Sequence, residues 1–397
     1  MGAGGGDSGV PDAGPGPDDG GVPDAGPPGM PTVTPIPEFD SEIFRQWAAL
    51  VELTDGRVFV AGGLIVRGPP GGGPGRTTGR EEIELFDVAK RSYREVAPLN
   101  EGRARASAVL LPDGKVLITG GTGGPPGETG MRRASAELFD PATNETTLLP
   151  EAMNTARAGH GSWLLSSGVH AGKVLIAGGA TTNAPELYDP ATGTFTLLGA
   201  TNAPSDAAGI AVLLDDQQVL FIGATNEFDT KLEQSYFRYD PATGVFDELG
   251  LFTMAARSRY TMTNLHDGRV LIAGGYTDDL GGLASLDVFD PSDNSLGPTG
   301  QTLGGARYSQ SAAVLPSGRV ALFSGFSMPG VDGALSTVAI WDPSDGTVED
   351  AAGEVSVGRS NSQALALSSG VIFVIGGQVT IGGGNTAIVP NVDIISE

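Results

Sequence analysis

The sequence predicts an all-β protein made of seven repeats of one four-stranded unit. Its 397 residues include 62 glycines and 28 prolines, a content typical of short strands joined by tight turns. A polar turn, an apolar run and a glycine pair recur together along the whole chain. Every copy except the last is followed by a segment that ends in an aromatic residue, aspartate and, in most copies, proline. Together these observations indicate a repeat architecture.

The clearest copy of the glycine-pair motif is residues 266–275, HDGRVLIAGG. Its Asp267-Gly268 predicts a hairpin turn, because both residue types tolerate the positive φ that such turns need. The other copies, some of them degenerate, are residues 55–63, 113–121, 172–179, 216–224, 317–325 and 369–377. They begin about 50 residues apart, a period in the range of one multi-stranded unit.

Each unit predicts four strands. One strand precedes the turn, the second ends at the glycine pair, and the third ends at a motif such as Phe139-Asp140-Pro141. Proline cannot donate a ladder hydrogen bond and therefore marks the strand end. A fourth strand follows, as at residues 194–198.

The last unit lacks a fourth strand, because residues 392–397 align with a third strand and end the chain. Residues 32–40 stand directly before the first unit, where the fourth strand of a preceding unit would lie. We therefore expect the N-terminal strand to complete the last unit, which removes an exposed sheet edge. Pro35 and Pro37 suit such an outermost strand.

This pattern resembles the kelch repeat of β-propellers, in the bacterial form related to the galactose-oxidase propeller. The resemblance covers residue 32 to the C-terminus and implies a seven-bladed kelch-type β-propeller with four antiparallel strands per blade. The usual tryptophan of the fourth strand is mostly replaced, for example by Tyr93, Phe195 and Phe246. The expected domains are a propeller at residues 32–397 and a Gly/Pro/Asp-rich disordered tether at residues 1–31.

Charge and composition exclude several classes of function. A net charge of −24 argues against binding nucleic acid or docking on anionic lipid through a basic surface. The absence of cysteine excludes disulfides, thiolate catalysis and zinc sites with cysteine ligands. The sequence contains no run of 18 or more apolar residues, so it predicts no transmembrane helix.

The N-terminal segment gives an expectation about location. Residues 9–14, GVPDAG, recur at residues 21–26. The segment resembles the linkers that follow the lipid-bearing cysteine of some bacterial surface lipoproteins. That resemblance implies an extracytoplasmic protein, lipid-anchored at the cell surface or secreted in a bacterium. An ordinary disordered terminus on a cytoplasmic protein is the alternative.

In a blade of four antiparallel strands, the second-to-third and blade-to-blade connections lie on the same face of the propeller. These are the connections that are long and variable in this sequence, so they should all lie on one face. The second-to-third connections are residues 64–80, 122–134, 180–184, 225–233, 276–284, 326–336 and 378–390. Function concentrates in variable loops held on a rigid scaffold.

In six of the seven units an arginine lies about ten residues before the hairpin turn, at the predicted mouth of a central channel. The predicted ligand-binding residues are Arg45, Arg103, Arg157, Arg257, Arg307 and Arg359, Asp206 at the same place in the fourth unit, and the adjoining His160, Tyr260 and Tyr308. Two interpretations stay open for each arginine. It tethers adjacent blades, or it helps to recruit a carboxylate, sulfate or phosphate group.

The sequence predicts no catalytic residue, metal site or cofactor. The copper site of galactose oxidase needs a cysteine cross-linked to a tyrosine and two histidine ligands, and this chain has no cysteine. No nucleophile-elbow or phosphate-loop motif occurs. We expect a monomeric, non-catalytic module that binds a protein or acidic glycan through the variable face. The alternative is a carbohydrate-active enzyme that resembles the kelch sialic-acid mutarotases.

Overall fold

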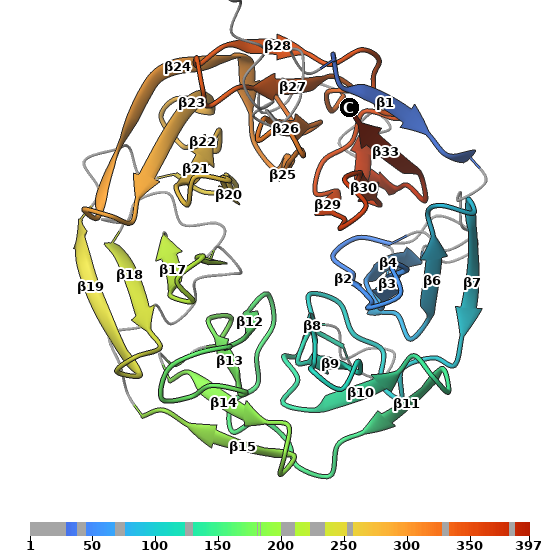
Figure 1. Ribbon diagram of the computed structural model, residues 1–397. Coiled ribbons are helices and arrows are strands. Elements are labelled where there is room, and N and C mark those ends of the chain that lie inside the picture. Colours follow the sequence, from blue (N-terminus) through green and yellow to red (C-terminus); the bar gives the residue numbers. More distant parts are fainter. Residues whose placement is uncertain are drawn as a thin grey trace, which may run out of the picture.

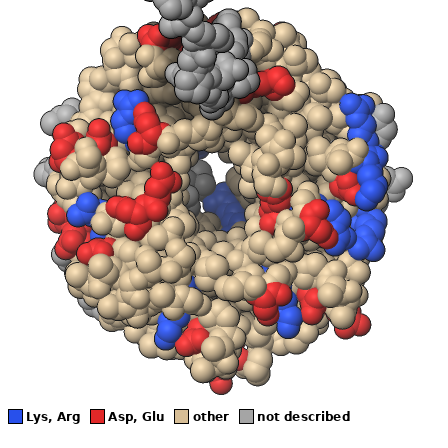
Figure 2. Space-filling model, viewed as in Figure 1, with Lys and Arg blue, Asp and Glu red and all other residues tan. Residues whose placement is uncertain are grey.

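Seven antiparallel sheets surround a central channel in the computed structural model (Figures 1 and 2). The structure describes residues 29–37, 45–67, 76–123, 130–180, 182, 184–199, 211–222, 235–251, 257–327, 333–380 and 386–397. Each sheet contributes four main strands, ordered from the channel outward. The predicted fold class, an all-β seven-bladed propeller, is confirmed.

The first three blades follow the repeat closely. Blade 1 contains β2 (Ala49–Glu52), β3 (Val58–Ala61), β6 (Ile83–Asp87) and β7 (Ser92–Val96). Blade 2 contains β8 (Ser107–Leu110), β9 (Val116–Thr119), β10 (Ala136–Asp140) and β11 (Glu145–Leu148). Blade 3 contains β12 (Gly161–Leu164), β13 (Val174–Ala177), β14 (Glu186–Asp189) and β15 (Thr194–Leu197).

The next three blades have the same order, with longer outer strands in blades 4 and 5. Blade 4 contains β16 (Ala211–Leu213), β17 (Val219–Ile222), β18 (Ser235–Asp240) and β19 (Val245–Leu251). Blade 5 contains β20 (Thr261–Asn264), β21 (Val270–Ala273), β23 (Gly281–Asp290) and β24 (Ser295–Arg307). Blade 6 contains β25 (Ser311–Val314), β26 (Val320–Phe323), β27 (Val338–Trp341) and β28 (Val348–Asp350).

Blade 7 joins the two ends of the chain. It contains β29 (Gln363–Ala366), β30 (Ile372–Ile375), β33 (Val392–Ser396) and, outermost, β1 (Thr32–Pro35). Val33 of β1 lies opposite Ile395 of β33 in antiparallel register. The predicted closure by the N-terminal strand is therefore confirmed, with Pro35 on an edge strand where its missing N–H costs no ladder bond.

Three of the predicted variable connections contain ordered strands. Residues 64–80 form a hairpin of β4 (Leu64–Arg67) and β5 (Arg76–Gly79). Residues 378–390 include a second hairpin, β31 (Gln378–Thr380) and β32 (Thr386–Ile388). In blade 5, β22 (Tyr276–Thr277) pairs with the extended start of β23. The variable face of blades 1, 5 and 7 therefore carries added antiparallel structure.

The second strand of every blade is buried along its whole length. β3, β9, β13, β17, β21, β26 and β30 have only buried residues. Both faces of such a strand pack against neighbouring blades, which explains why the sequence shows a continuous apolar run instead of strict alternation. The outer strand β15 is mostly exposed.

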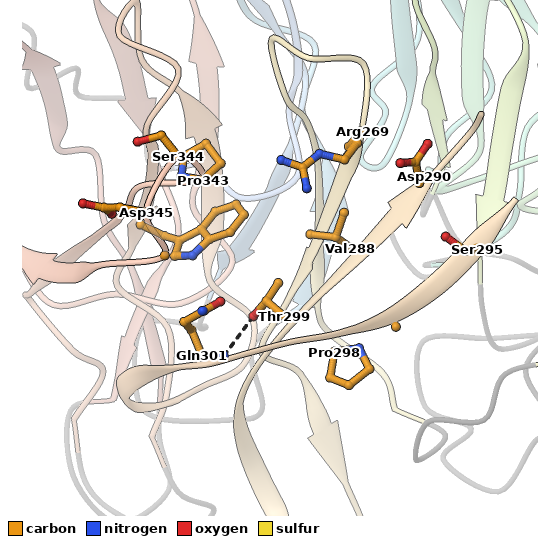
Figure 3. A pocket seen from close by; sticks show the side chains of 13 residues that line it. Arg269, Val288, Asp290, Ser295, Pro298, Thr299, Gln301, Pro343, Ser344 and Asp345 are labelled. Atoms are coloured by element: carbon orange, nitrogen blue, oxygen red, sulfur yellow. Dashed lines mark hydrogen bonds between the residues drawn. The ribbon is translucent and has the colours of Figure 1, made fainter. Parts of the chain in front are cut away.

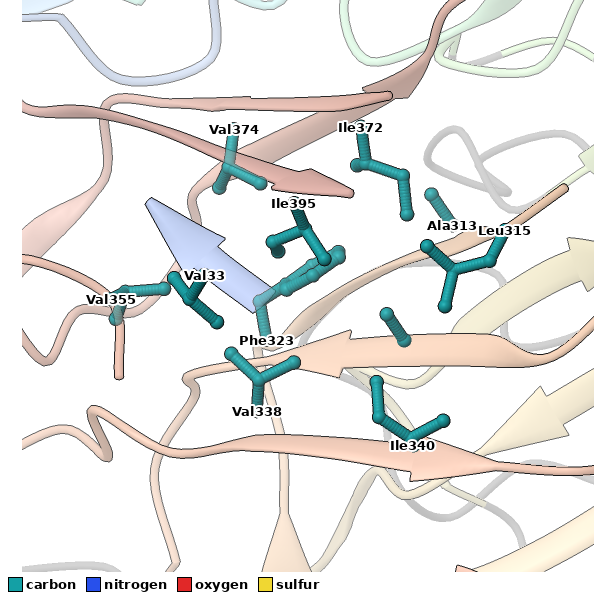
Figure 4. Close-up of a cluster of buried hydrophobic side chains, with 11 residues drawn as sticks. Val33, Ala313, Leu315, Phe323, Val338, Ile340, Val355, Ile372, Val374 and Ile395 are labelled. Atoms are coloured by element: carbon teal, nitrogen blue, oxygen red, sulfur yellow. The ribbon is translucent and has the colours of Figure 1, made fainter. Parts of the chain in front are cut away.

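The core lies between the blades. Figure 4 shows the cluster between blades 6 and 7, where Phe323 and Ile340 pack with Val374 and Ile395. Val33 of β1 belongs to the same cluster. The N-terminal strand therefore closes the ring with apolar contacts in addition to its ladder hydrogen bonds.

Candidate functional site

The six arginines predicted from their spacing, here called the blade arginines, are buried inside the blades. None of Arg45, Arg103, Arg157, Arg257, Arg307 and Arg359 is more than 4% exposed. Five of them form ion pairs with a carboxylate on the third strand of the same blade. These pairs are Arg45–Glu84 at 3.0 Å, Arg103–Glu137 at 2.6 Å, Arg157–Glu186 at 3.2 Å, Arg257–Asp287 at 2.5 Å, and Arg359–Asp393.

Each paired carboxylate also holds the connection that enters its blade, wherever that connection is described. The backbone N–H groups of Asn100 and Glu101 donate to Glu137 at 2.7 and 3.2 Å. Burial lowers the pKa of the Arg103 guanidinium, and the negative charge of Glu137 opposes that shift. Five of the six guanidinium groups are therefore engaged in ion pairs inside the blades. The role of the blade arginines in ligand binding stays a prediction.

The glycine pair explains how neighbouring blades fit together. A Cβ added to Gly62 would lie 2.3 Å from the carbonyl oxygen of Arg103 in the next blade. The N–H of Gly63 donates to that same oxygen at 2.9 Å. Both glycines have positive φ, 66° and 104°, a conformation that glycine adopts without a steric penalty. The motif is therefore a contact between blades.

The remaining predicted ligand-binding residues lie in different environments. His160 is 5% exposed and its Nε2 lies 2.8 Å from the Thr119 hydroxyl. Burial, with the nearby charges of Arg157 and Arg103, lowers the pKa of His160 to about 3. The buried Tyr260 hydroxyl donates to the Ile222 carbonyl oxygen at 2.7 Å.

Tyr308 is also buried, with 6% of its surface exposed. Burial raises the pKa of its hydroxyl. Asp206 lies outside the described residues, so its role in ligand binding stays a prediction.

A second ring of residues lies closer to the channel. We call it the channel ring: Trp47, Arg105, Gly159, Arg259, Ser309 and Asn361, each two positions after a blade arginine. All six have positive φ, between 52° and 68°. Five of them are not glycine, and such a conformation is uncommon for them. The left-handed conformation is therefore a regular feature of the connections that enter these six blades.

Backbone hydrogen bonds join the channel ring from blade to blade. The N–H of Arg105 donates to the Trp47 carbonyl oxygen at 2.9 Å, and that of Gly159 donates to the Arg105 carbonyl oxygen at 2.8 Å. In the same way, the N–H of Ser309 donates to the Arg259 carbonyl oxygen at 2.9 Å. The N–H of Asn361 donates to the Ser309 carbonyl oxygen at 2.8 Å. Because these residues lead into the innermost strands, which surround the channel in Figure 1, they lie at its mouth.

The channel ring carries two arginines whose guanidinium groups lie over aromatic rings. The Arg105 guanidinium carbon lies 3.8 Å from the centre of the half-buried Trp47 ring. The exposed Arg259 lies 5.9 Å from the ring centres of both Tyr276 and Tyr308. The sequence signal for both is a fixed offset of two residues from a blade arginine. The offset alone does not reveal that the second position faces the channel mouth.

A hollow between blades 5 and 6 is a concave feature outside the channel (Figure 3). Its volume is about 460 Å³, and Arg269, Asp290, Gln301 and Asp345 are among the residues that line it. Its charged groups already serve local turns. Arg269 pairs with Asp267 at 2.6 Å, and Asp345 accepts the N–H and hydroxyl of Thr347. The channel ring is therefore the better candidate site.

Acidic side chains are spread over the face shown in Figure 2, around the open channel. Within the described parts of the chain, no group of three or more His, Asp or Glu side chains is placed to hold a metal ion. The same parts contain no helix long and apolar enough to cross a membrane.

The comparisons with known proteins show the fold. No family model and no curated protein matches the chain. A solved fungal alcohol oxidase of the AA5 family, with catalytic diversity and in complex with copper, is similar in structure. The TM-score is 0.65 at 19% sequence identity, and the match covers 89% of this chain and 74% of the oxidase chain. At that identity, the likeness establishes a shared propeller architecture and carries no activity across.

Proposed function

We propose that this protein is a non-catalytic binding module that recognises an acidic glycan or an acidic segment of a protein at the channel ring. The observation that carries the proposal is the pair of arginines in the channel ring, Arg105 over the ring of Trp47 and Arg259 near the rings of Tyr276 and Tyr308. Five non-glycine residues adopt a left-handed conformation at the same register. In blade 3 the same position is a glycine, Gly159.

The chemistry of the channel ring fits an anionic ligand. Arg105 and Arg259 belong to blades 2 and 5. The Arg105 guanidinium stacks on the Trp47 ring, and that of Arg259 lies 5.9 Å from the centre of the Tyr276 ring. Stacking fixes the plane of a guanidinium, and its five N–H donors suit bidentate contacts with carboxylates. Trp47 and Tyr276 add flat apolar surfaces on which a sugar ring packs well. Two fixed cations on an otherwise acidic protein also concentrate positive potential at one opening.

Removal of the two arginines tests the proposal. The variant Arg105→Ala/Arg259→Ala should lose at least tenfold in affinity for an acidic ligand, because charge-assisted hydrogen bonds are the strong ones. Wild type and variant are compared on an array of uronic-acid and sialic-acid oligosaccharides and acidic peptides. Isothermal titration then measures the Kd of each ligand found.

A matched variant controls for charge. Arg57→Ala/Arg269→Ala removes two arginines from hairpin turns, where each pairs with an aspartate two residues earlier. It should keep wild-type affinity. The absence of any anionic ligand for the wild type, or equal losses in both variants, would contradict the proposal.

The enzymatic alternative requires a proton carrier beside an arginine that holds a carboxylate. Among the described residues, His160 is buried at the blade arginines, and five carboxylates there are held in ion pairs. NMR exchange spectroscopy of sialic acid distinguishes the two functions. Accelerated interconversion of the sugar's anomers by the wild type, and its loss in Arg105→Ala/Arg259→Ala, would establish the enzyme in place of the binding module.

We also propose an extracytoplasmic location, anchored at the cell surface or secreted. The support is compositional: the repeated Gly-Val-Pro-Asp-Ala-Gly at residues 9–14 and 21–26 suits a tether that keeps a folded domain away from a surface. Protease shaving of intact cells that produce the protein in its native host tests this. Protection of the protein in intact cells would contradict an exposed location.

A further inference from the structure

Blade 6 departs from the pattern of paired blade arginines. Its Arg307 is placed like the others, since Nη1 donates to the carbonyl oxygens of Ser324 and Thr337 at 3.1 and 3.0 Å. Nη2 donates to the Thr337 hydroxyl at 2.7 Å. Arg307 is only 4% exposed. No carboxylate among the described residues pairs with it, although the other five blade arginines each have one.

Ala339 takes the place of the missing carboxylate. On β27 it lies opposite Leu322 of the second strand, as Glu137 on β10 lies opposite Ile118. It also follows Thr337 by two residues, as Glu137 follows Ser135, whose carbonyl oxygen accepts from Arg103 at 3.0 Å. The methyl group of Ala339 leaves the cation without a neutralising partner at this position.

The backbone donors that hold the carboxylate in other blades have counterparts here. In blade 2, the N–H groups of Asn100 and Glu101, three and two residues before the blade arginine, donate to Glu137. The same positions before Arg307 are Gly304 and Gly305. Both are exposed, and a Cβ added to either would meet no atom within 4 Å. Neither residue therefore has a side chain that could cover its backbone N–H group, and the surroundings of both are open.

We propose that a small monovalent anion, either chloride or a carboxylate the size of formate or acetate, binds in blade 6 between Arg307 and the N–H groups of Gly304 and Gly305. A buried cation that has lost its partner is strongly destabilising, and an anion at this position replaces the carboxylate that the other blades supply. The anion ties the blade 5–blade 6 connection to β27. The site is separate from the channel ring and does not depend on the ligand there.

Asp350 is the competing counterion. It lies opposite Ala339 on β28, is exposed, and its charge raises the pKa of Arg307 against the lowering effect of burial. It forms no ion pair with Arg307 in the described structure. The experiment therefore includes Asp350→Asn, which removes this charge and leaves Arg307 in place.

The direct test is diffraction from wild-type crystals soaked in sodium bromide, because bromide replaces chloride and scatters anomalously. We expect an anomalous peak within hydrogen-bond distance of the Arg307 guanidinium. In solution, chloride, formate or acetate replaces the bulky anion MOPS at constant ionic strength. The Tm should rise by about 2 °C when the small anion reaches about ten times its Kd.

Two variants test the site in opposite directions: one fills the empty carboxylate position in blade 6, and the other empties that position in blade 7. Ala339→Glu supplies a carboxylate from the chain, so its Tm should not respond to small anions. Asp393→Ala creates the same vacancy beside Arg359 in blade 7, so its lowered Tm should gain a response to acetate.

The proposal predicts that Asp350→Asn keeps the response to anions. No bromide at Arg307, or equal responses of the wild type and Ala339→Glu, would overturn it. A Tm that falls in Asp350→Asn without any anion response in the wild type would make Asp350 the counterion and the proposal wrong.

Discussion

At the scale of the residue, the blade arginines and the glycine pairs make repeated contacts between neighbouring blades. The Arg157 carbonyl oxygen accepts the N–H of Gly121 from the preceding blade at 2.8 Å, while its side chain pairs with Glu186 inside its own blade. One residue thus connects two sheets through its backbone and its side chain. His160 lies in the same layer, where Thr119 is its hydrogen-bond partner.

His160 should make the stability of the protein depend on pH. Burial holds its pKa at about 3 in the folded protein, against about 6.5 in the unfolded chain. The unfolded chain therefore binds the proton first, and stability is lost as pH falls from about 6.5 toward 3. This residue costs about 1.4 kcal/mol per pH unit in that window, or about 2 kcal/mol between pH 7 and pH 5.

Urea unfolding at pH 7 and pH 5 measures this loss. In His160→Gln the loss between the two pH values should be about 2 kcal/mol smaller than in the wild type. His266→Gln, at an exposed hairpin turn, is the control and should retain the full wild-type loss. Equal losses in the wild type and His160→Gln would show that His160 is not held neutral.

At the scale of the element, β1 decides whether the ring is closed. Its ladder covers the outer edge of β33, and the N–H of Val33 also donates to the Ala352 carbonyl oxygen of the neighbouring blade at 3.1 Å. The strand therefore contacts both blades at the junction of the two chain ends. An uncovered β33 would present unpaired backbone groups to other chains.

A charge placed on the inner face of β1 should open this closure. Val33→Asp puts a carboxylate into the cluster of Phe323 and Ile395 and should lower the free energy of unfolding by at least about 3 kcal/mol. Thr32→Asp, on the exposed side of the same strand, should change it by less than about 0.5 kcal/mol. Urea unfolding measures both, and equal small effects would mean that β1 does not close the ring.

At the scale of the molecule, each blade is sandwiched between two others and has no core of its own. The cluster of Leu175, Phe221 and Tyr239, for example, spans blades 3 and 4. Every hydrophobic cluster of this kind lies between adjacent blades in the described structure. Loss of one blade therefore exposes the faces of both neighbours, and we expect the ring to unfold as one unit.

Two core substitutions in distant blades test this cooperativity. Leu175→Ala in blade 3 should cost about 2–5 kcal/mol, and Val33→Ala in blade 7 should cost less. The double variant should show one unfolding transition by both circular dichroism and tryptophan fluorescence. Its loss should equal the sum of the single losses within about 0.5 kcal/mol. Two separate transitions would show that blades unfold independently.

The repeat in the sequence sufficed to predict the blades, their number and the closure by the N-terminal strand. Each of these depends on local patterns, such as the turn at Asp267-Gly268 and the proline after Asp140. The tether predicted at residues 1–31 stays a prediction, because its residues 1–28 lie outside the described residues. The ordered hairpin of β4 and β5 did not follow from the sequence, because its loop is rich in glycine and proline.

The sequence by itself determined the register of the blade arginines, and the tertiary structure alone decided what surrounds them. Five of them have a partner 29 to 39 residues further along the chain, such as Glu137 for Arg103, and spacing along the chain does not show which way a side chain turns. The same holds for Trp47 and Arg105, which meet only because adjacent blades close around the channel. Local patterns fix strands and turns, whereas burial and charge pairing depend on neighbours that only the closed ring brings together.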